Sequence, residues 1–168
     1  LVYIFIYHGF EDDMKVFGSQ EEALQSMKYL RRKTVEAGLQ EPYVVAQTFD
    51  VSLGVRYSNE LGYDAISAYS MAGGSEDREY PYRELVKNNR NFWEACKASG
   101  KKVIPIVNAG WDNRPRRIDK ERYAYLYKSS GGPWFRQPTP AELAEHLRAA
   151  LRWNRENPAQ AEADTVMI

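Results

Sequence analysis

The run LVYIFIY at residues 1–7 is the feature that most constrains the fold, because it is apolar and aromatic without any polar alternation. Such a run is typical of a strand that is covered on both faces, as strands are in parallel sheets. Four further segments are predicted to be strands or the start of one. They are PYVVAQT at residues 42–48, YDAISAYS at 63–70, KKVIPIVNA at 101–109 and TVMI at 165–168.

Helical segments are predicted between these strands. The clearest local signal is Thr139-Pro140-Ala141-Glu142, which places a capping Thr, a Pro at the first helical position and a Glu at the third. This helix is expected to end at Asn157-Pro158. The other helical segments are a helix after the Ser19 and Glu22 capping box that stops at Gly38, a short turn near residues 53–61, and a helix from Tyr82 to Ser99.

Strands that alternate with helices pair in parallel through right-handed crossovers, so the predicted class is α/β. Two architectures fit: a partial (β/α)8 TIM barrel with about five parallel strands, and an open doubly wound parallel sheet. No glycine-rich nucleotide motif follows any strand, which disfavours the nucleotide-binding form of the open sheet. We favour the barrel, because the strands repeatedly deliver polar groups to one end. Both ends of the sequence lie inside apolar runs, so residues 1–168 are expected to be a single partial domain of a longer (β/α)8 catalytic domain.

Composition narrows the possible partners. The chain has 168 residues, of which 43% are hydrophobic, enough for a real core. Its 23 basic and 23 acidic residues give zero formal charge, so no global field attracts nucleic acid or an anionic membrane. Cys96 is the single cysteine and cannot form an internal disulfide, and no metal-binding spacing is present. We therefore expect no nucleic-acid partner, no membrane partner, no metal and no cofactor.

The predicted strands end in polar and aromatic side chains, and in both architectures ligands bind beyond the carboxyl ends of the strands. Sugars need polar partners at their hydroxyl edges and flat apolar surfaces beneath their C–H faces. The pattern therefore favours a site for a hydroxyl-rich ligand. The residues at the four strand ends are His8; Gln47, Thr48, Phe49 and Asp50; Tyr69 and Ser70; and Asn108, Trp111 and Asp112.

Several of these residues also have an ordinary structural explanation. His8 is equally explained as a capping or loop histidine, and Asp50 as the acceptor of a turn or helix cap before Ser52. Tyr69 is equally explained by packing at the rim of a barrel. Asp64 lies near the start of its strand, the end that is associated with stability, so we favour a structural role for it.

Trp111 and Asp112 are the stronger candidates, because they follow Gly110 directly after a strand and have no helix of their own to pack beneath. The neighbouring Arg114, Arg116 and Arg117 are suited to an anionic group or to salt bridges with nearby acids. Residues 121–132 and the following GGPWFRQPTP form a long insertion that is typical of a lid or a subsite wall. The alternating Tyr123, Tyr125 and Tyr127 are equally consistent with a short edge strand.

The segment GWDNRPR at residues 110–116, followed by GGPWFR and T-P-x-E-L, resembles the glycoside hydrolase family 99-like and 71-like proteins, including the WbsX-like group linked to polysaccharide loci. The likeness covers most of the chain. It extends over VYIFIY, LGYDAISAYS, VIPIVNAGWDNRPR and the GGPWFRQPTPAEL entry to the helix before TVMI. Each motif is weak alone, but their combination in this order is fairly specific.

The resemblance implies a (β/α)8 barrel that acts on glycosidic bonds, with this chain as its C-terminal half. In such proteins a TVMI-like strand runs into a Trp-Asn-Glu-Trp type segment, whose Glu is a candidate catalytic carboxylate that we expect beyond Ile168. The Glu-rich motif of the classified family 99 endo-mannosidases is not found here, so their α-mannoside specificity is not implied. His8 stands where many relatives are expected to have an Asp.

We therefore expect a glycoside hydrolase of a bacterial polysaccharide system, with a carbohydrate substrate and carboxylate acid/base chemistry. The alternative is a non-catalytic saccharide-binding barrel of the same family, which lacks the acid pair. A third possibility is an unrelated doubly wound domain that binds a small metabolite. Asp112 is the candidate catalytic residue, and the candidate substrate-binding residues are His8, Gln47, Asp50, Tyr69, Asn108, Trp111 and Arg114.

Overall fold

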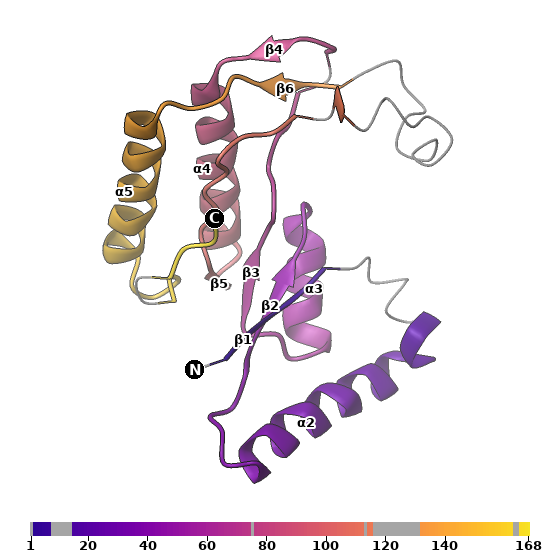
Figure 1. The fold of residues 1–168 in the computed structure, drawn as a ribbon. Coiled ribbons are helices and arrows are strands. Elements are labelled where there is room, and N and C mark those ends of the chain that lie inside the picture. Colours follow the sequence, from indigo (N-terminus) through magenta and orange to yellow (C-terminus); the bar gives the residue numbers. More distant parts are fainter. Residues whose placement is uncertain (1, 8–14, 75, 113, 116–131, 163–164) are drawn as a thin grey trace.

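The computed structural model of the chain describes residues 2–7, 15–74, 76–112, 114–115, 132–162 and 165–168. In this part of the chain, strands and helices alternate (Figure 1). None of the described helices is long and apolar enough to span a membrane. The elements are β1 (Tyr3–Ile6), α2 (Gln20–Glu36), β2 (Tyr43–Gln47), α3 (Val51–Glu60), β3 (Ala65–Ser67), β4 (Glu79–Tyr80), α4 (Tyr82–Ala98), β5 (Lys102–Val103), β6 (Trp134–Phe135) and α5 (Pro140–Glu156).

Three of the described helices begin at a side chain that caps the first turn. Ser19 Oγ accepts a hydrogen bond from the Glu22 amide at 3.2 Å, and the Asp50 carboxylate accepts one from the Ser52 amide at 2.8 Å. At α5 the predicted capping box is complete, because Thr139 and Glu142 each bond the other's backbone amide. The short turn expected near residues 53–61 is a full helix, α3, which the Asp50 cap starts two residues earlier than predicted.

The main sheet is parallel, and its strands follow the order β1-β2-β3-β5. Tyr3 pairs with Tyr43, Val45 pairs with Ala65, and β3 pairs with β5 in the same direction. A helix lies between each strand of this sheet and the next strand of the sheet along the chain. The predicted α/β class with a parallel sheet is therefore confirmed.

The sheet continues beyond β5 through isolated bridges. Ile106 forms a parallel bridge with Met167, whose amide donates to the Pro105 carbonyl at 2.9 Å. Pro105 has no backbone N–H, so only its carbonyl oxygen is able to form a hydrogen bond with a neighbouring strand. The strand expected at residues 101–109 is therefore shorter, at Lys102–Val103, and residues 165–168 contribute a bridge where a fifth strand was expected.

The described helices all pack on the same face of the sheet. Side chains alternate along a strand, so Val44 and Ala46 share one face and Val45 lies on the other. Val44 and Ala46 pack with residues of α2 and α3, whereas Ile66 of β3 packs with residues of α4 and α5. The helix residues in these clusters are Ala23 and Met27 of α2, Tyr57 of α3, Phe92, Trp93 and Cys96 of α4, and Ala150 and Trp153 of α5.

The opposite face of the sheet carries Val45, Ala65 and Ile104, and their cluster includes no residue of a described helix. On this face the hydroxyl groups of Tyr3 and Thr165 lie 3.1 Å apart. In a flat sheet, four strand spacings would separate these two residues by about 19 Å, which is beyond the reach of a tyrosine side chain. The sheet is therefore strongly curved, with the helix-free face on its concave side.

At the amino ends of the strands, Arg31 and Asp64 form an ion pair at 2.7 Å. The same oxygen of Asp64 accepts the Val44 amide at 2.7 Å, and Arg31 also donates to the carbonyls of Pro42 and Gly62. Asp64 thus joins α2, β2 and the turn before β3. This arrangement agrees with the structural role favoured for Asp64.

Candidate functional site

Four aromatic side chains meet where the strands of the main sheet end. Tyr7 follows β1, Phe49 follows β2, Tyr69 follows β3, and Trp111 lies beyond β5. The ring of Tyr69 is central, with centroid distances of 4.7 Å to Tyr7, 5.0 Å to Phe49 and 6.4 Å to Trp111. These four residues are named the aromatic cluster below. It joins the carboxyl ends of strands that are far apart in the sequence.

The aromatic cluster lies at the mouth of the concave face. Along β1, β2 and β3 the odd-numbered residues point to this face, and Tyr7, Phe49 and Tyr69 continue that alternation past the strand ends. Tyr7 and Phe49 are 45% and 47% exposed. The hydroxyl groups of Tyr7 and Tyr69 lie 3.4 Å apart. The cluster therefore offers accessible apolar ring surface together with phenolic hydroxyls.

Asp112 follows the last ring of the cluster and is held by Arg114. The guanidinium makes two parallel contacts with the carboxylate, from Nε at 3.0 Å and from Nη2 at 2.8 Å, and the Arg114 amide donates to the same carboxylate. The Arg114 guanidinium also lies over the Trp134 ring, 4.6 Å from its centroid. A carboxylate held in this way keeps its negative charge at low cost, which suits a base, a nucleophile or an electrostatic stabiliser.

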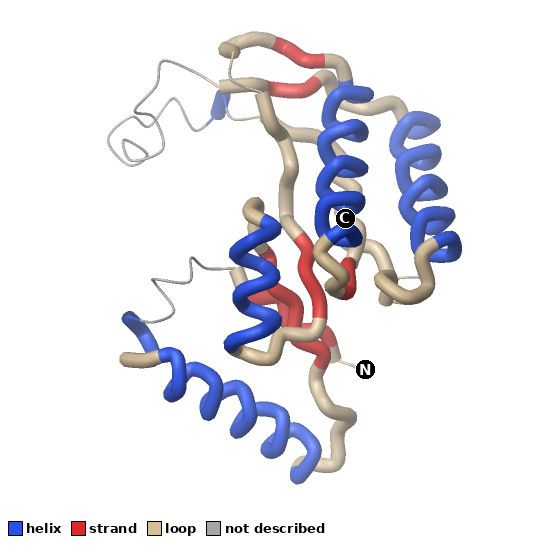
Figure 2. Tube along the Cα trace, turned by 180° about the vertical axis from the view of Figure 1, so that it is seen from behind, coloured by secondary structure: helices blue, strands red, loops and turns tan. Residues whose placement is uncertain are grey.

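The short ribbon of β4 and β6 lies beyond the carboxyl ends of the main strands, as Figures 1 and 2 both show. Trp134 of β6 forms an antiparallel bridge with Asp112, and the Phe135 amide donates to the Trp111 carbonyl at 2.8 Å. Part of the predicted GGPWFRQPTP insertion is thus β6, and it fixes the backbone of Trp111 and Asp112. The sequence did not indicate β4, because two residues give no detectable periodicity.

Three of the predicted binding residues have their side-chain polar groups engaged within the protein. Asp50 caps α3. Gln47 is 8% exposed and donates to the Met167 sulfur at 3.1 Å. Asn108 is 7% exposed and its side-chain amide bonds Tyr69, Met71 and Asn89. Their roles in substrate binding stay predictions, but each side chain has a structural role as well.

The structure brings Tyr69, Trp111, Asp112 and Arg114 to the same end of the sheet and adds Tyr7 and Phe49. Tyr7 was missed, and Phe49 was named at the end of its strand but was not chosen as a binding residue. Each ring lies an even number of residues after Tyr3 or Tyr43, a spacing that is visible in the sequence. The remaining predictions here fall outside the described residues. They concern His8, Arg116, Arg117, Tyr123, Tyr125 and Tyr127.

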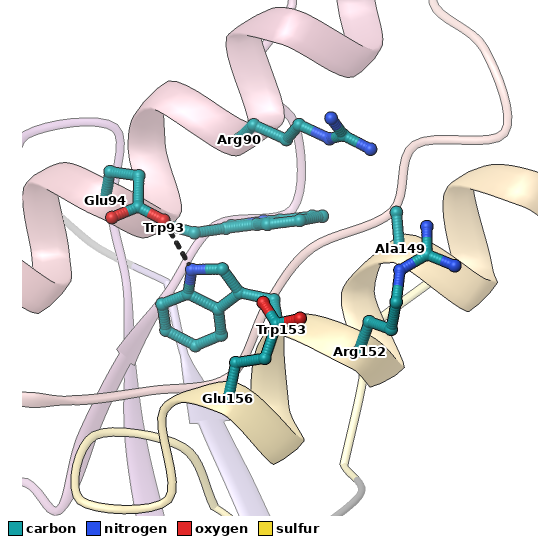
Figure 3. A pocket seen from close by; sticks show the side chains of 7 residues that line it. All are labelled: Arg90, Trp93, Glu94, Ala149, Arg152, Trp153 and Glu156. Carbon is teal, nitrogen blue, oxygen red and sulfur yellow. Dashed lines mark hydrogen bonds between the residues drawn. The ribbon is translucent and has the colours of Figure 1, made fainter.

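A separate depression of about 320 Å³ lies between α4 and α5, on the outer side of the helix layer (Figure 3). Trp93 and Trp153 line it, and the Trp153 indole donates to the Glu94 carboxylate at 2.6 Å. Both indoles are almost fully buried, so little of their surface is available to a ligand. This depression lacks the converging groups that the strand ends provide, and the strand ends are the better candidate site.

Within the described residues, no group of three or more His, Cys, Asp and Glu side chains is arranged to hold a metal ion. Comparisons with protein-family models, with curated proteins and with solved structures each found no match.

Proposed function

We propose that this chain forms part of a (β/α)8 barrel glycoside hydrolase, in which the aromatic cluster binds the saccharide. The observation that carries the proposal is the meeting of four aromatic rings at the carboxyl ends of parallel strands. Ligand sites lie at this end of α/β sheets, and sugars stack their C–H faces on such rings. The likeness of GWDNRPR and the segments around it to glycoside hydrolases points to the same ligand class.

Two features of the sheet support a barrel over an open doubly wound fold. A doubly wound sheet carries helices on both faces, whereas a barrel carries them only outside. Here the described helices pack on one face, and the Tyr3 to Thr165 contact curves the sheet around the other. The helix-free face would then line the interior of the barrel, with the aromatic cluster at its upper rim.

Asp112 is the candidate for the ionised member of the pair of carboxyl groups that glycoside hydrolysis requires. Its two contacts with Arg114 favour a base, nucleophile or stabiliser over a proton donor. The proton donor would then be a second carboxyl group. The resemblance assigns that group to a Trp-Asn-Glu-Trp type segment that follows a TVMI-like strand.

The second candidate is a saccharide-binding barrel without catalysis. The observation that favours it is the same Asp112 and Arg114 pair, because both carboxylate oxygens are already engaged. In that case Asp112 orders the loop that carries Trp111. The two candidates share the ligand class and differ in whether Asp112 acts on it.

Binding is tested with Tyr69→Ala and Trp111→Ala, measured by calorimetry and affinity electrophoresis against a panel of soluble polysaccharides. Loss of one stacking ring is expected to weaken binding by about tenfold, the equivalent of about 1.4 kcal/mol. Tyr29→Ala is the matched control, because Tyr29 is 55% exposed on α2, away from the strand ends. No binding to any member of the panel, or equal losses in all three variants, would refute the proposal.

Catalysis is tested with Asp112→Asn in the natural protein, by the release of reducing ends from whichever polysaccharide binds. Glu60→Gln is the control, because it also removes a carboxylate that is paired with an arginine, Arg56 at 3.0 Å. Activity lost in Asp112→Asn, with binding retained, would support the hydrolase. Binding without turnover in the wild type would support the non-catalytic alternative.

A further inference from the structure

A buried network of hydrogen bonds lies directly beneath the aromatic cluster, with Asn108 at its centre. The Asn108 amide donates to Asn89 Oδ1 at 3.1 Å, and its carbonyl accepts from the Tyr82 hydroxyl at 2.8 Å. The Asn108 side chain donates to the Tyr69 carbonyl at 3.1 Å and accepts from the Met71 amide and from Asn89. One residue thus joins the exits of β3 and β5 to helix α4.

The network extends to α5 through His146. Tyr82 is 1% exposed and His146 is 2% exposed, and the Tyr82 hydroxyl lies 2.9 Å from His146 Nδ1. The Tyr82 hydroxyl has a single proton, and the Asn108 carbonyl is only an acceptor, so this proton is directed to Asn108. Nδ1 of His146 must then carry a proton and donate to Tyr82. In the neutral ring Nε2 is then the unprotonated nitrogen, and it is buried without a hydrogen-bond partner.

We propose that Tyr82, Asn89 and His146 are positioning residues that set the placement of Tyr69 relative to Trp111. The inference rests on the saccharide-binding role proposed for the aromatic cluster, and it adds how that surface is held. Tyr69 is fixed through its own carbonyl by Asn108, and Trp111 lies three residues after Asn108. No residue of the network needs to touch the sugar.

The positioning role explains why polar groups are buried between α4, α5 and the sheet, although apolar side chains alone would hold these layers together. The surrounding residues Trp93, Leu85 and Ile106 are fully buried and apolar. Apolar contacts fix the distance between layers but leave small shifts along the layer inexpensive, whereas hydrogen bonds are directional. A chain of directional bonds from α5 to Tyr69 therefore specifies the spacing of the two rings more tightly than packing alone.

The central variant is Tyr82→Phe, which removes one hydroxyl and leaves Asn108 O and His146 Nδ1 without their partner. Tyr57→Phe is the control, because Tyr57 is 2% exposed and lies in the separate cluster under α2 and α3. Tyr82→Phe is expected to weaken saccharide binding roughly fivefold or more, at temperatures where both variants are fully folded. In combination with Trp111→Ala the loss should be less than additive, because the ring being positioned is already absent.

A readout that needs no saccharide separates this inference from the proposed function. The indole N–H resonance of Trp111 is assigned by its loss in Trp111→Phe, and its chemical shift is then compared in the two Tyr→Phe variants. The resonance should shift or broaden in Tyr82→Phe and stay in place in Tyr57→Phe. If it moves but no saccharide binds the wild type, the proposed function fails while the positioning role stands. An unmoved resonance, or equal affinity losses in both variants, would overturn the positioning role.

His146 provides a test by rescue. In His146→Asn, the side-chain amide nitrogen takes the place of Nδ1 and is able to donate to Tyr82, whereas His146→Leu removes the donor. The Trp111 resonance and the affinity should be close to wild type in His146→Asn and perturbed in His146→Leu. Equal behaviour of the two variants would show that His146 acts by packing alone and would remove it from the positioning set.

Discussion

Acid is expected to destabilise this chain through His146. The imidazole is 2% exposed, and its Nε2 atom is buried without a hydrogen-bond partner. Burial lowers the pKa of His146 from 6.5 to about 4, and the positive charge of Arg90 acts in the same direction. Tyr82 is the other titratable group in contact with the ring, and burial raises its pKa to about 12, so it stays neutral throughout the acidic range.

The sign follows from which state binds the proton. Between the two pKa values, the unfolded chain protonates His146 and the folded chain does not, so unfolding takes up a proton. The free energy of unfolding therefore has its full His146 contribution above pH 6.5 and loses it as the pH falls toward 4. At about 1.4 kcal/mol per pH unit, the loss is at most about 3.5 kcal/mol. That is a large share of the stability of an ordinary domain.

The assay is urea unfolding at several pH values between 7.5 and 4.5, followed by circular dichroism. The difference between wild type and His146→Asn isolates the histidine, because carboxylates contribute equally to both. Glu142, for example, has its pKa lowered to about 2 by hydrogen bonds from Thr139 and Arg136, and its effect belongs to more acidic conditions. The wild type should lose about 2–3 kcal/mol more than His146→Asn. Parallel curves for the wild type and His146→Asn would refute the reasoning.

Two further predictions concern the packing of the sheet. Gly54→Ala should lower the free energy of unfolding in urea by about 1–3 kcal/mol, because the new Cβ would lie 2.8 Å from the Ile66 side chain. This loss is expected although alanine favours helices. The double variant Gly54→Ala/Ile66→Val should recover part of the stability, and a stabilised single variant would contradict the contact. Asp64→Asn should cost about 1–3 kcal/mol, because it removes the charge that pairs with the half-buried Arg31. Glu60→Gln, which breaks an exposed ion pair, should cost less than about 0.5 kcal/mol, and similar losses in these two variants would contradict a special role for Asp64.

Most of the helices were predictable from the sequence because their signals are local, although α3 was expected only as a short turn. Ser19, Asp50 and Thr139 each cap the helix that follows them, and a cap is completed by atoms within three residues. The parallel class was predictable for a related reason, since apolar strands joined by helices have few alternatives. What these signals lack is information on distant partners. They did not indicate that β4 pairs with β6, whose residues lie more than fifty positions away.

The candidate site was predictable only in part. The parallel sheet predicted that the carboxyl ends of its strands lie close together, and Tyr69, Trp111 and Asp112 lie at that end as expected. Which side chains point into the mouth of the concave face depends on how side chains alternate between the two faces along each strand. Tyr7 was missed, and Phe49 was named at its strand end but not chosen as a binding residue, because the predictions favoured polar neighbours over the rings that follow the odd-numbered pattern of β1 and β2.

Asn108 shows why alternation fails at the fourth strand. Ile104 packs on the helix-free face with Val45 and Ala65, and strict alternation from Ile104 would place Ile106 and Asn108 on that face too. Ile106 packs instead in the cluster of the helices, and the Asn108 side-chain oxygen accepts a hydrogen bond from the Asn89 side chain of α4. The change occurs at Pro105, where the chain passes from pairing with β3 to pairing with Met167. This single break in the alternation thus directs the Asn108 side chain toward the helix layer. Asn108 lies three residues before Trp111, so its hydrogen bonds fix the backbone close to the aromatic cluster.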